Sequence, residues 1–210
     1  EPGTGPPDYQ TSSYDALYIH EVDYENLIKS GREWFQPVSA LNGIKITPGF
    51  REIIPAEGIR FTLRALARAS VPTTFRLYEG TTLHSEIIIP EVNLFSTTGS
   101  YAGENITGGI LTPLSASPEF EVKFFNGGEQ SARGWLDYVS LQARANIVFD
   151  GKFLGFSDIR SVSPGRISMF SVRSSLQAVN IWDVTDPFNP KIISYIRDGD
   201  YLRFTAGTDS

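Results

Sequence analysis

The sequence predicts an all-β protein: an antiparallel β-sandwich, jelly-roll-like, with one short N-terminal helix. Three observations lead to this prediction. Several segments alternate apolar and polar side chains with a period of two, Gly, Pro and Asp residues separate them, and a single segment has a helical pattern. Many short strands with almost no helix are typical of sandwiches and jelly rolls. The length of 210 residues suits one large sandwich or two small domains.

The helix is predicted within residues 20–32, whose sequence is HEVDYENLIKSGR. Asp23 can cap its N-terminus, and Leu27 and Ile28 supply an apolar face. Gly31 stands where a left-handed residue is expected at the C-terminal end. We therefore expect about two turns of helix here.

These elements suggest a division of the chain. An N-terminal lead strand and the short helix occupy residues 1–31, and the β-sandwich occupies residues 32–210. The Asp150-Gly151 turn leaves open a subdivision of the sandwich near residue 150.

Residues Ile59–Arg68 give the clearest strand pattern. Their apolar side chains fall on one side, and arginine and threonine side chains fall on the other. This is the pattern of a strand with one buried and one solvated face. The same alternation recurs in Thr73–Tyr78 and in Phe120–Phe124.

Residues Trp135–Phe149 are long enough for either a strand or a helix. Their aromatic and β-branched content, with no capping residue before Trp135, favours a long or bent strand. Trp135 and Val139 begin one face of this strand, although Asp137 interrupts it. Four later strands are predicted between turn residues: Ile167–Arg173, Ala178–Val184, Lys191–Arg197 and Tyr201–Ala206.

Composition excludes several classes of function. The chain has 18 Lys and Arg against 24 Asp and Glu, a net charge of −6, and its basic residues are scattered, which argues against a nucleic-acid partner. No apolar run approaches the roughly 20 residues of a transmembrane helix. The absence of cysteine excludes cysteine nucleophiles, disulfides and thiolate metal sites, but leaves the cellular compartment open. Residues 1–8 do not read as a signal peptide, so we expect the chain to begin inside a longer protein.

No catalytic, cofactor or metal site is predicted. His20 and His84 are the two histidines, and neither has a second imidazole or a carboxylate at a metal-ligand spacing. We expect His84 to be a solvated residue of a loop or strand surface. No Gly-x-Ser-x-Gly motif of a serine hydrolase is present.

Asp183 and Asp186 are the nearest approach to the paired carboxylates of a glycosidase. They lie among turn dipeptides such as Asp186-Pro187, where Asp side chains usually accept hydrogen bonds from nearby backbone amides. We therefore interpret both as turn residues, and the same preference for a structural over a catalytic role applies to Glu86 and Glu91.

Three tryptophans could line a sugar-binding platform. Trp135 and Trp182 lie inside predicted strands among apolar neighbours, so we expect both in the core. Trp34 has no such strand context. The aromatic residues and the expected fold leave a carbohydrate-binding jelly-roll module as the alternative function.

Three separated segments carry a resemblance to a known family. They are HEVDYENLIKSGREWF at His20–Phe35, ARGWLDYVSLQARANIVF at Ala132–Phe149 and VNIWDVTDPFNPKIIS at Val179–Ser194. In this order and at about these distances they resemble the region upstream of the peptidase domain in the gingipain-like cysteine peptidase sortase of the type IX secretion system. The resemblance extends from about Tyr14 to Ala206, and between the three segments it is one of pattern.

The resemblance implies a cell-surface protein of the outer membrane. In that family a downstream caspase-like domain with a His/Cys pair removes the C-terminal signal of secreted cargo and links the cargo to lipopolysaccharide. Because this chain has no cysteine, no catalytic residue is carried over. The implied role is a non-catalytic β-domain that braces its own downstream peptidase domain or docks cargo or proteins of the attachment machinery.

Overall fold

The computed structural model describes residues 5–28 and 32–208, and its chain forms two units. The jelly-roll unit consists of Leu17–Phe50 and Ile54–Ala143. The terminal unit consists of the residues up to Ala16, of Arg51–Ile53 and of the residues from Arg144 onward.

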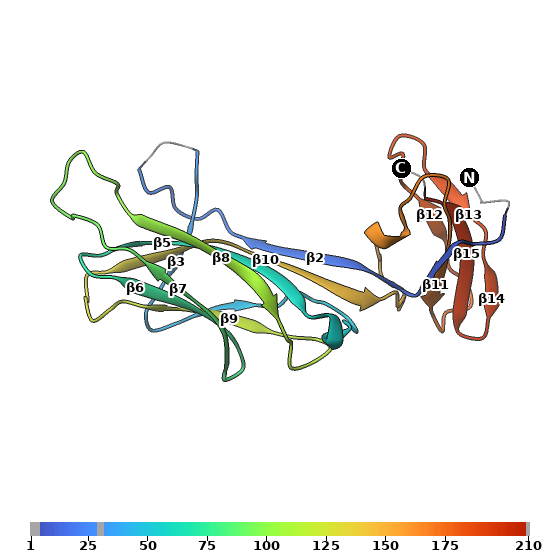
Figure 1. Cartoon of the computed structure of the whole chain (residues 1–210), viewed down its shortest axis with the longest axis horizontal. Coiled ribbons are helices and arrows are strands. Elements are labelled where there is room, and N and C mark those ends of the chain that lie inside the picture. The colour runs from blue at the N-terminus through green and yellow to red at the C-terminus, as the bar shows by residue number, and fades with distance from the viewer. Residues whose placement is uncertain (1–4, 29–31, 209–210) are drawn as a thin grey trace. The chain divides into compact units, whose positions relative to one another are not determined.

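Two sheets build the jelly-roll unit (Figure 1). One has the order β2-β10-β5-β8, with the strands β2 (Ser13–Glu21), β10 (Arg133–Asn146), β5 (Ile59–Arg68) and β8 (Gly103–Leu111). The other has the order β4-β9-β6-β7, with the strands β4 (Ile44–Ile46), β9 (Phe120–Phe125), β6 (Thr73–Glu79) and β7 (Thr82–Ile89). Counted along the chain, these eight strands are ordered 1-8-3-6 and 2-7-4-5, which is the jelly-roll arrangement. The predicted antiparallel sandwich is confirmed.

Two small elements complete this unit. Strand β3 (Gln36–Val38) pairs with the beginning of β10, and the 3-10 turn η1 (Pro55–Glu57) leads into β5.

Strand β5 shows how the alternating pattern makes the core. Every second residue of the strand is buried: Ile59, Phe61, Leu63, Ala65 and Ala67. Antiparallel pairing places Leu63 beside Val139 of β10. In the other sheet the rings of Phe75 and Phe124 lie 4.9 Å apart. Each large apolar side chain buried in this way contributes about 1.5–3 kcal/mol to stability.

A β-bulge in β10 explains the residue that interrupts its pattern. Leu136 pairs with Ala65 and Tyr138 pairs with Arg64, so Asp137 is the extra residue. The bulge changes the phase of the alternation. Trp135 therefore lies on the outer face beside Leu66, whereas the expected face partner Val139 lies on the core face.

The predicted N-terminal helix is wrong. Strand β2 continues to Glu21, and Glu25 and Phe35 form an antiparallel bridge with two backbone hydrogen bonds of 2.9 and 3.0 Å. No α-helix occurs in residues 5–28 and 32–208, and the expected C-terminal residue Gly31 lies outside the described residues. We name residues 25–28 and 32–35 the covering segment, because it buries Phe35 against Trp135. This burial outweighs a weak local helical pattern.

The terminal unit contains a four-stranded sheet of the order β1-β11-β15-β14. Its strands are β1 (Tyr9–Thr11), β11 (Ile167–Arg173), β15 (Tyr201–Gly207) and β14 (Ile196–Asp198). The strands predicted at Ile167–Arg173 and Tyr201–Ala206 are therefore confirmed. Stacked rings of Phe170 and Phe204, 5.4 Å apart, and fully buried Leu202 form its core.

A buried ionic cluster holds the N-terminal residues in the terminal unit. The Arg144 guanidinium donates to Asp158 at 2.6 Å and to Asp15 at 2.9 Å, and the Tyr9 hydroxyl donates to Asp158 at 3.0 Å. Burial opposes ionisation of Asp15, but hydrogen bonds from Arg144 and from the Ile159 amide, in the 3-10 turn η2 (Ile159–Ser161), lower the pKa of this carboxyl group. The Arg144 guanidinium and the Asp15 carboxylate thus stabilise each other's charged forms within the terminal unit.

A two-stranded hairpin of β12 (Ile181–Asp183) and β13 (Lys191–Ile193) replaces the longer strands predicted there. Ile181 and Ile193 pack against the core of the terminal unit. The cross-strand pair Trp182 and Ile192 faces solvent, and Trp182 is 51% exposed. The prediction of a core position for Trp182 is wrong, because a two-stranded hairpin covers the core with one face alone.

The two tryptophans should therefore differ in their effect on stability. Trp135→Ala should lower the free energy of unfolding of the jelly-roll unit by about 3–5 kcal/mol, because Trp135 is 1% exposed and its removal leaves a cavity. Trp182→Ala should change the stability by no more than about 0.5 kcal/mol. Denaturant unfolding followed by circular dichroism measures both, and equal losses would contradict the burial described above.

Candidate binding groove

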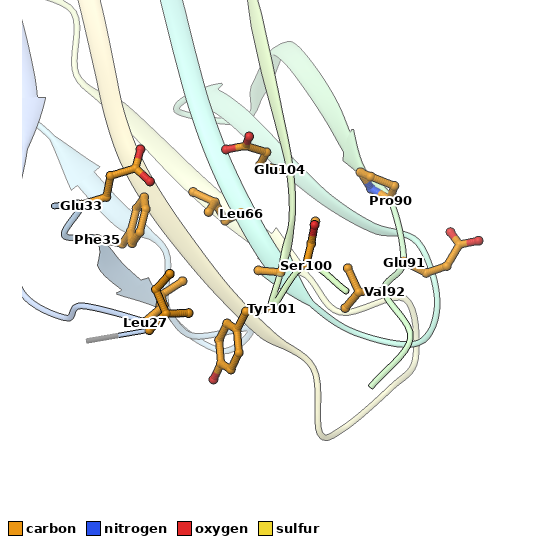
Figure 2. A pocket seen from close by; sticks show the side chains of 13 residues that line it. Leu27, Glu33, Phe35, Leu66, Pro90, Glu91, Val92, Ser100, Tyr101 and Glu104 are labelled. Atoms are coloured by element: carbon orange, nitrogen blue, oxygen red, sulfur yellow. The ribbon is translucent and has the colours of Figure 1, made fainter. Parts of the chain in front are cut away.

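A groove of about 410 Å³ lies on the jelly-roll unit, at the end of β5 and the beginning of β8 (Figure 2). Four parts of the chain form it: the covering segment, Leu66 near the end of β5, the residues that follow β7, and the residues before and at the beginning of β8. The lining residues are Leu27, Ile28, Glu33, Phe35, Leu66, Pro90, Glu91, Val92, Ser100, Tyr101, Ala102, Gly103 and Glu104.

The walls of the groove combine apolar side chains with carboxylates and other polar groups. Figure 2 shows Leu27 and Phe35 on one side and Val92 on the other. Phe35 belongs to a small buried cluster with Leu66 and Trp135, which lies on the outer face of the sheet. These three side chains fill the space beneath the groove. The groove is therefore a surface feature, separate from the sandwich core.

Hydrogen bonds fix the wall made by the covering segment. The Trp135 indole N–H donates to Glu25 at 3.0 Å, and the Asn26 side chain donates to the Glu33 carbonyl oxygen at 2.7 Å. On the opposite wall, a Cβ atom on Gly103 would collide with the Pro90 carbonyl oxygen, so glycine is required there. The groove is thus formed before any ligand arrives.

The guanidinium group of Arg64 binds three carboxylates beside the groove. Arg64 donates to Glu104 at 2.6 Å, to Asp137 at 2.7 Å and to Glu33 at 3.2 Å. One positive and three negative charges give this cluster a net charge of 1 − 3 = −2. Glu91 makes no hydrogen bond or ion pair with the described residues. Among those that line the groove there is no lysine or arginine.

The environment changes the ionisation of this cluster. Burial raises the pKa of Asp137, the hydrogen bond from Arg64 partly opposes the rise, and the like charges of Glu33 and Glu104 add to it. The pKa of Arg64 is raised: burial alone would lower it, but the hydrogen bonds to Glu104 and Asp137 outweigh that effect. Arg64 therefore stays charged, and the excess of charge in the cluster is negative.

The two histidines lie outside the groove. His20 is 2.8 Å from the side-chain oxygen of Gln36. His84 lies 3.1 Å from Glu79, and its side chain is 8% exposed, so the prediction of a solvated surface residue is wrong. Glu79 also accepts a hydrogen bond from the Leu114 amide at 2.9 Å, which shows how the buried pair is satisfied within the fold.

The paired carboxylates of the sequence are turn residues, as predicted. Asp183 accepts a hydrogen bond from the Thr185 amide and Asp186 accepts one from the Phe188 amide, each at 3.0 Å. The bond from Thr185 lowers the pKa of Asp183. Neither carboxylate is therefore placed as a general acid.

Sequence reasoning missed the groove as a site. The Arg64 cluster draws on four separated segments, and no sequence pattern singles out Glu33 or Glu104 as a site residue. The available signal was Asp137, a charge interrupting an apolar strand, together with Arg64 on the solvated face of the neighbouring strand. In residues 5–28 and 32–208 no group of three or more His, Cys, Asp or Glu could hold a metal ion. Over the same part of the chain, no helix is long and apolar enough to cross a membrane.

The fold and the groove together define a jelly-roll β-sandwich domain with an open, acidic and apolar surface groove. Among solved structures, PorU from Porphyromonas gingivalis, in the crystal structure of its dimeric latent form, is similar to this chain with a TM-score of 0.74 and 14% sequence identity. The similarity covers 100% of this chain and 20% of that chain, so this chain spans about a fifth of the PorU length. At this identity the likeness shows a PorU-like fold. No family model and no curated protein matches the chain.

Replacing Asp137 by asparagine should remove one pH-dependent contribution to stability. Because the pKa of Asp137 is raised in the folded chain, its contribution is fully present below the unfolded pKa, about 3.9, and is lost as the pH rises through the folded pKa. The unsubstituted protein should therefore lose stability relative to Asp137→Asn as the pH rises from about 4. Urea midpoints across this range measure the difference, and a difference independent of pH would contradict the raised pKa.

Proposed function

We propose that this chain is the non-catalytic, pre-peptidase β-domain of a PorU-like sortase of the type IX secretion system. The observation that carries the proposal is the likeness of the fold to PorU over the whole of this chain. The three sequence segments at His20–Phe35, Ala132–Phe149 and Val179–Ser194 support it independently, since they resemble the region upstream of the sortase peptidase domain. In this role the chain works at the cell surface, associated with the outer membrane.

Contacts between two of these segments give the resemblance a structural basis. The covering segment comes from the first and Trp135 from the second, and they meet through the Glu25 hydrogen bond and the burial of Phe35. The third segment forms the hairpin of β12 and β13 in the terminal unit. Residues of the first two segments therefore stabilise the fold, and residues of the third form an exposed hairpin. Both roles fit a bracing or docking domain.

The hairpin is the exposed apolar surface best suited to docking. Trp182 and Ile192 form an exposed cross-strand pair, and Phe188 at the tip is 96% exposed. Contiguous exposed apolar residues commonly mark protein interaction sites, and exposed tryptophan is enriched among residues that dominate binding energy. We propose that this hairpin contacts the peptidase domain, cargo or a protein of the attachment machinery.

The double substitution Trp182→Ser with Ile192→Ser tests this role in the full-length protein, in the cells that produce it. Cargo that retains its C-terminal signal should accumulate several-fold, because the apolar contact is lost while the core of the terminal unit is kept. Immunoblotting of cargo measures the effect. Ile106→Ser with Ile110→Ser on β8 is the matched control, since both residues are exposed and lie in the jelly-roll unit.

Two outcomes would contradict the proposal. One is a reading frame that does not continue beyond Ser210 into a caspase-like peptidase domain. The other is turnover of a cargo-signal peptide by the purified chain of 210 residues, if a point substitution within this chain abolished that turnover.

Carbohydrate binding is the second candidate function, and the exposure of two tryptophans favours it. Trp182 is 51% and Trp34 is 43% exposed, as stacking on a sugar ring requires. If this function holds, Trp182→Ala or Trp34→Ala should reduce glycan binding at least tenfold in calorimetry, with an unchanged circular dichroism spectrum. Binding that survives both substitutions, or no binding on a glycan array, would exclude a tryptophan platform.

A further inference from the structure

We infer that the groove of the jelly-roll unit binds an extended peptide segment in which a lysine or arginine stands next to apolar residues. The inference deepens the proposed docking role and rests on it, since it names the chemistry of one partner.

The apolar part of the walls favours a ligand that has apolar side chains. Leu27, Phe35 and Val92 face the groove, and a volume of about 410 Å³ is within the range of pockets that bury most of a small ligand, about 300–1,000 Å³. Side chains of leucine or valine size would remove this apolar surface from water, which is favourable.

The charge of the groove selects a cation. Arg64 leaves its three carboxylate partners with a net charge of −2, and Glu91 adds a carboxylate without a partner among the described residues. An anionic ligand would meet repulsion at this site, and a cation would meet attraction, which salt screens because the Glu33 and Glu104 side chains are more than half exposed. The carboxylates of Glu33 and Glu104 are held by Arg64, and no metal-binding group occurs among residues 5–28 and 32–208.

A basic side chain matches both features at once. Lysine and arginine have a long aliphatic stem that packs against apolar surface and a charged end that remains at the rim. Because Gly103, Pro90 and the bridge between Glu25 and Phe35 fix the walls, the free energy cost of ordering the groove is already met within the fold.

Peptide binding to the purified chain tests the inference. The probe is a fluorescein-labelled peptide, Gly-Ser-Leu-Lys-Leu-Lys-Leu-Ser-Gly, and fluorescence anisotropy measures its affinity. It should bind, whereas the peptides with Glu in place of Lys, or with Ser in place of Leu, should bind at least tenfold more weakly. Higher ionic strength should weaken the binding, since the rim charges are exposed to salt.

Two variants locate the site. Glu91→Gln should weaken binding about fivefold, because it removes the unpaired rim charge, and Val92→Ser should weaken it further by removing an apolar wall contact. Glu119→Gln is the matched control, since Glu119 is an exposed carboxylate of the same unit outside the groove, and it should leave the affinity unchanged.

Equal binding of the Lys and Glu peptides, equal binding of the Leu and Ser peptides, or equal effects of the Glu91 and Glu119 substitutions would overturn the inference. These outcomes are distinct from failure of the proposed function. If the hairpin variant loses cargo processing but the purified chain does not bind the peptide, the docking role of the hairpin is supported and the groove has no part in it.

Discussion

Burial of Trp135 on the outer face of its sheet is the constraint on which the groove depends. An indole on this face would meet water unless another part of the chain covered it, and its N–H group needs an acceptor. The covering segment meets both needs, since Phe35 packs against the ring and Glu25 accepts the hydrogen bond. The position of Leu27 and Glu33, and hence one wall of the groove, follows from this contact.

Local patterns predicted the strands well because period-two alternation depends on neighbours within one strand. The strands at Ile59–Arg68, Thr73–Tyr78, Phe120–Phe124 and Ile167–Arg173 all occur in the structure. Such patterns could not reveal the bulge at Asp137, which changes the face of every later residue in β10. They also favoured a helix at residues 20–32, which does not form. Phe35 is instead buried against Trp135, a residue far away in the sequence, and a local pattern does not show such a contact.

Residue type alone was a poor guide to environment in two cases. Trp182 was expected in the core but stands on the outer side of a two-stranded hairpin, and His84 was expected in solvent but pairs with buried Glu79. The exposure of each of these two side chains depends on how much of its strand is covered by neighbouring elements. The groove was beyond prediction for a related reason: Arg64 binds Glu33, Glu104 and Asp137 from three other segments, and nothing in the sequence places them together.

The division of the chain into two units has a consequence for biosynthesis. The jelly-roll unit lies between residues that belong to the terminal unit, and in that unit strand β1 pairs Tyr9 with Ser168, while β11 pairs with β15 at the far end of the chain. During synthesis, β1 must therefore wait unpaired until β11 has been made. Separate expression of the terminal unit would likewise require joining its pieces, because the jelly-roll unit separates them in the sequence.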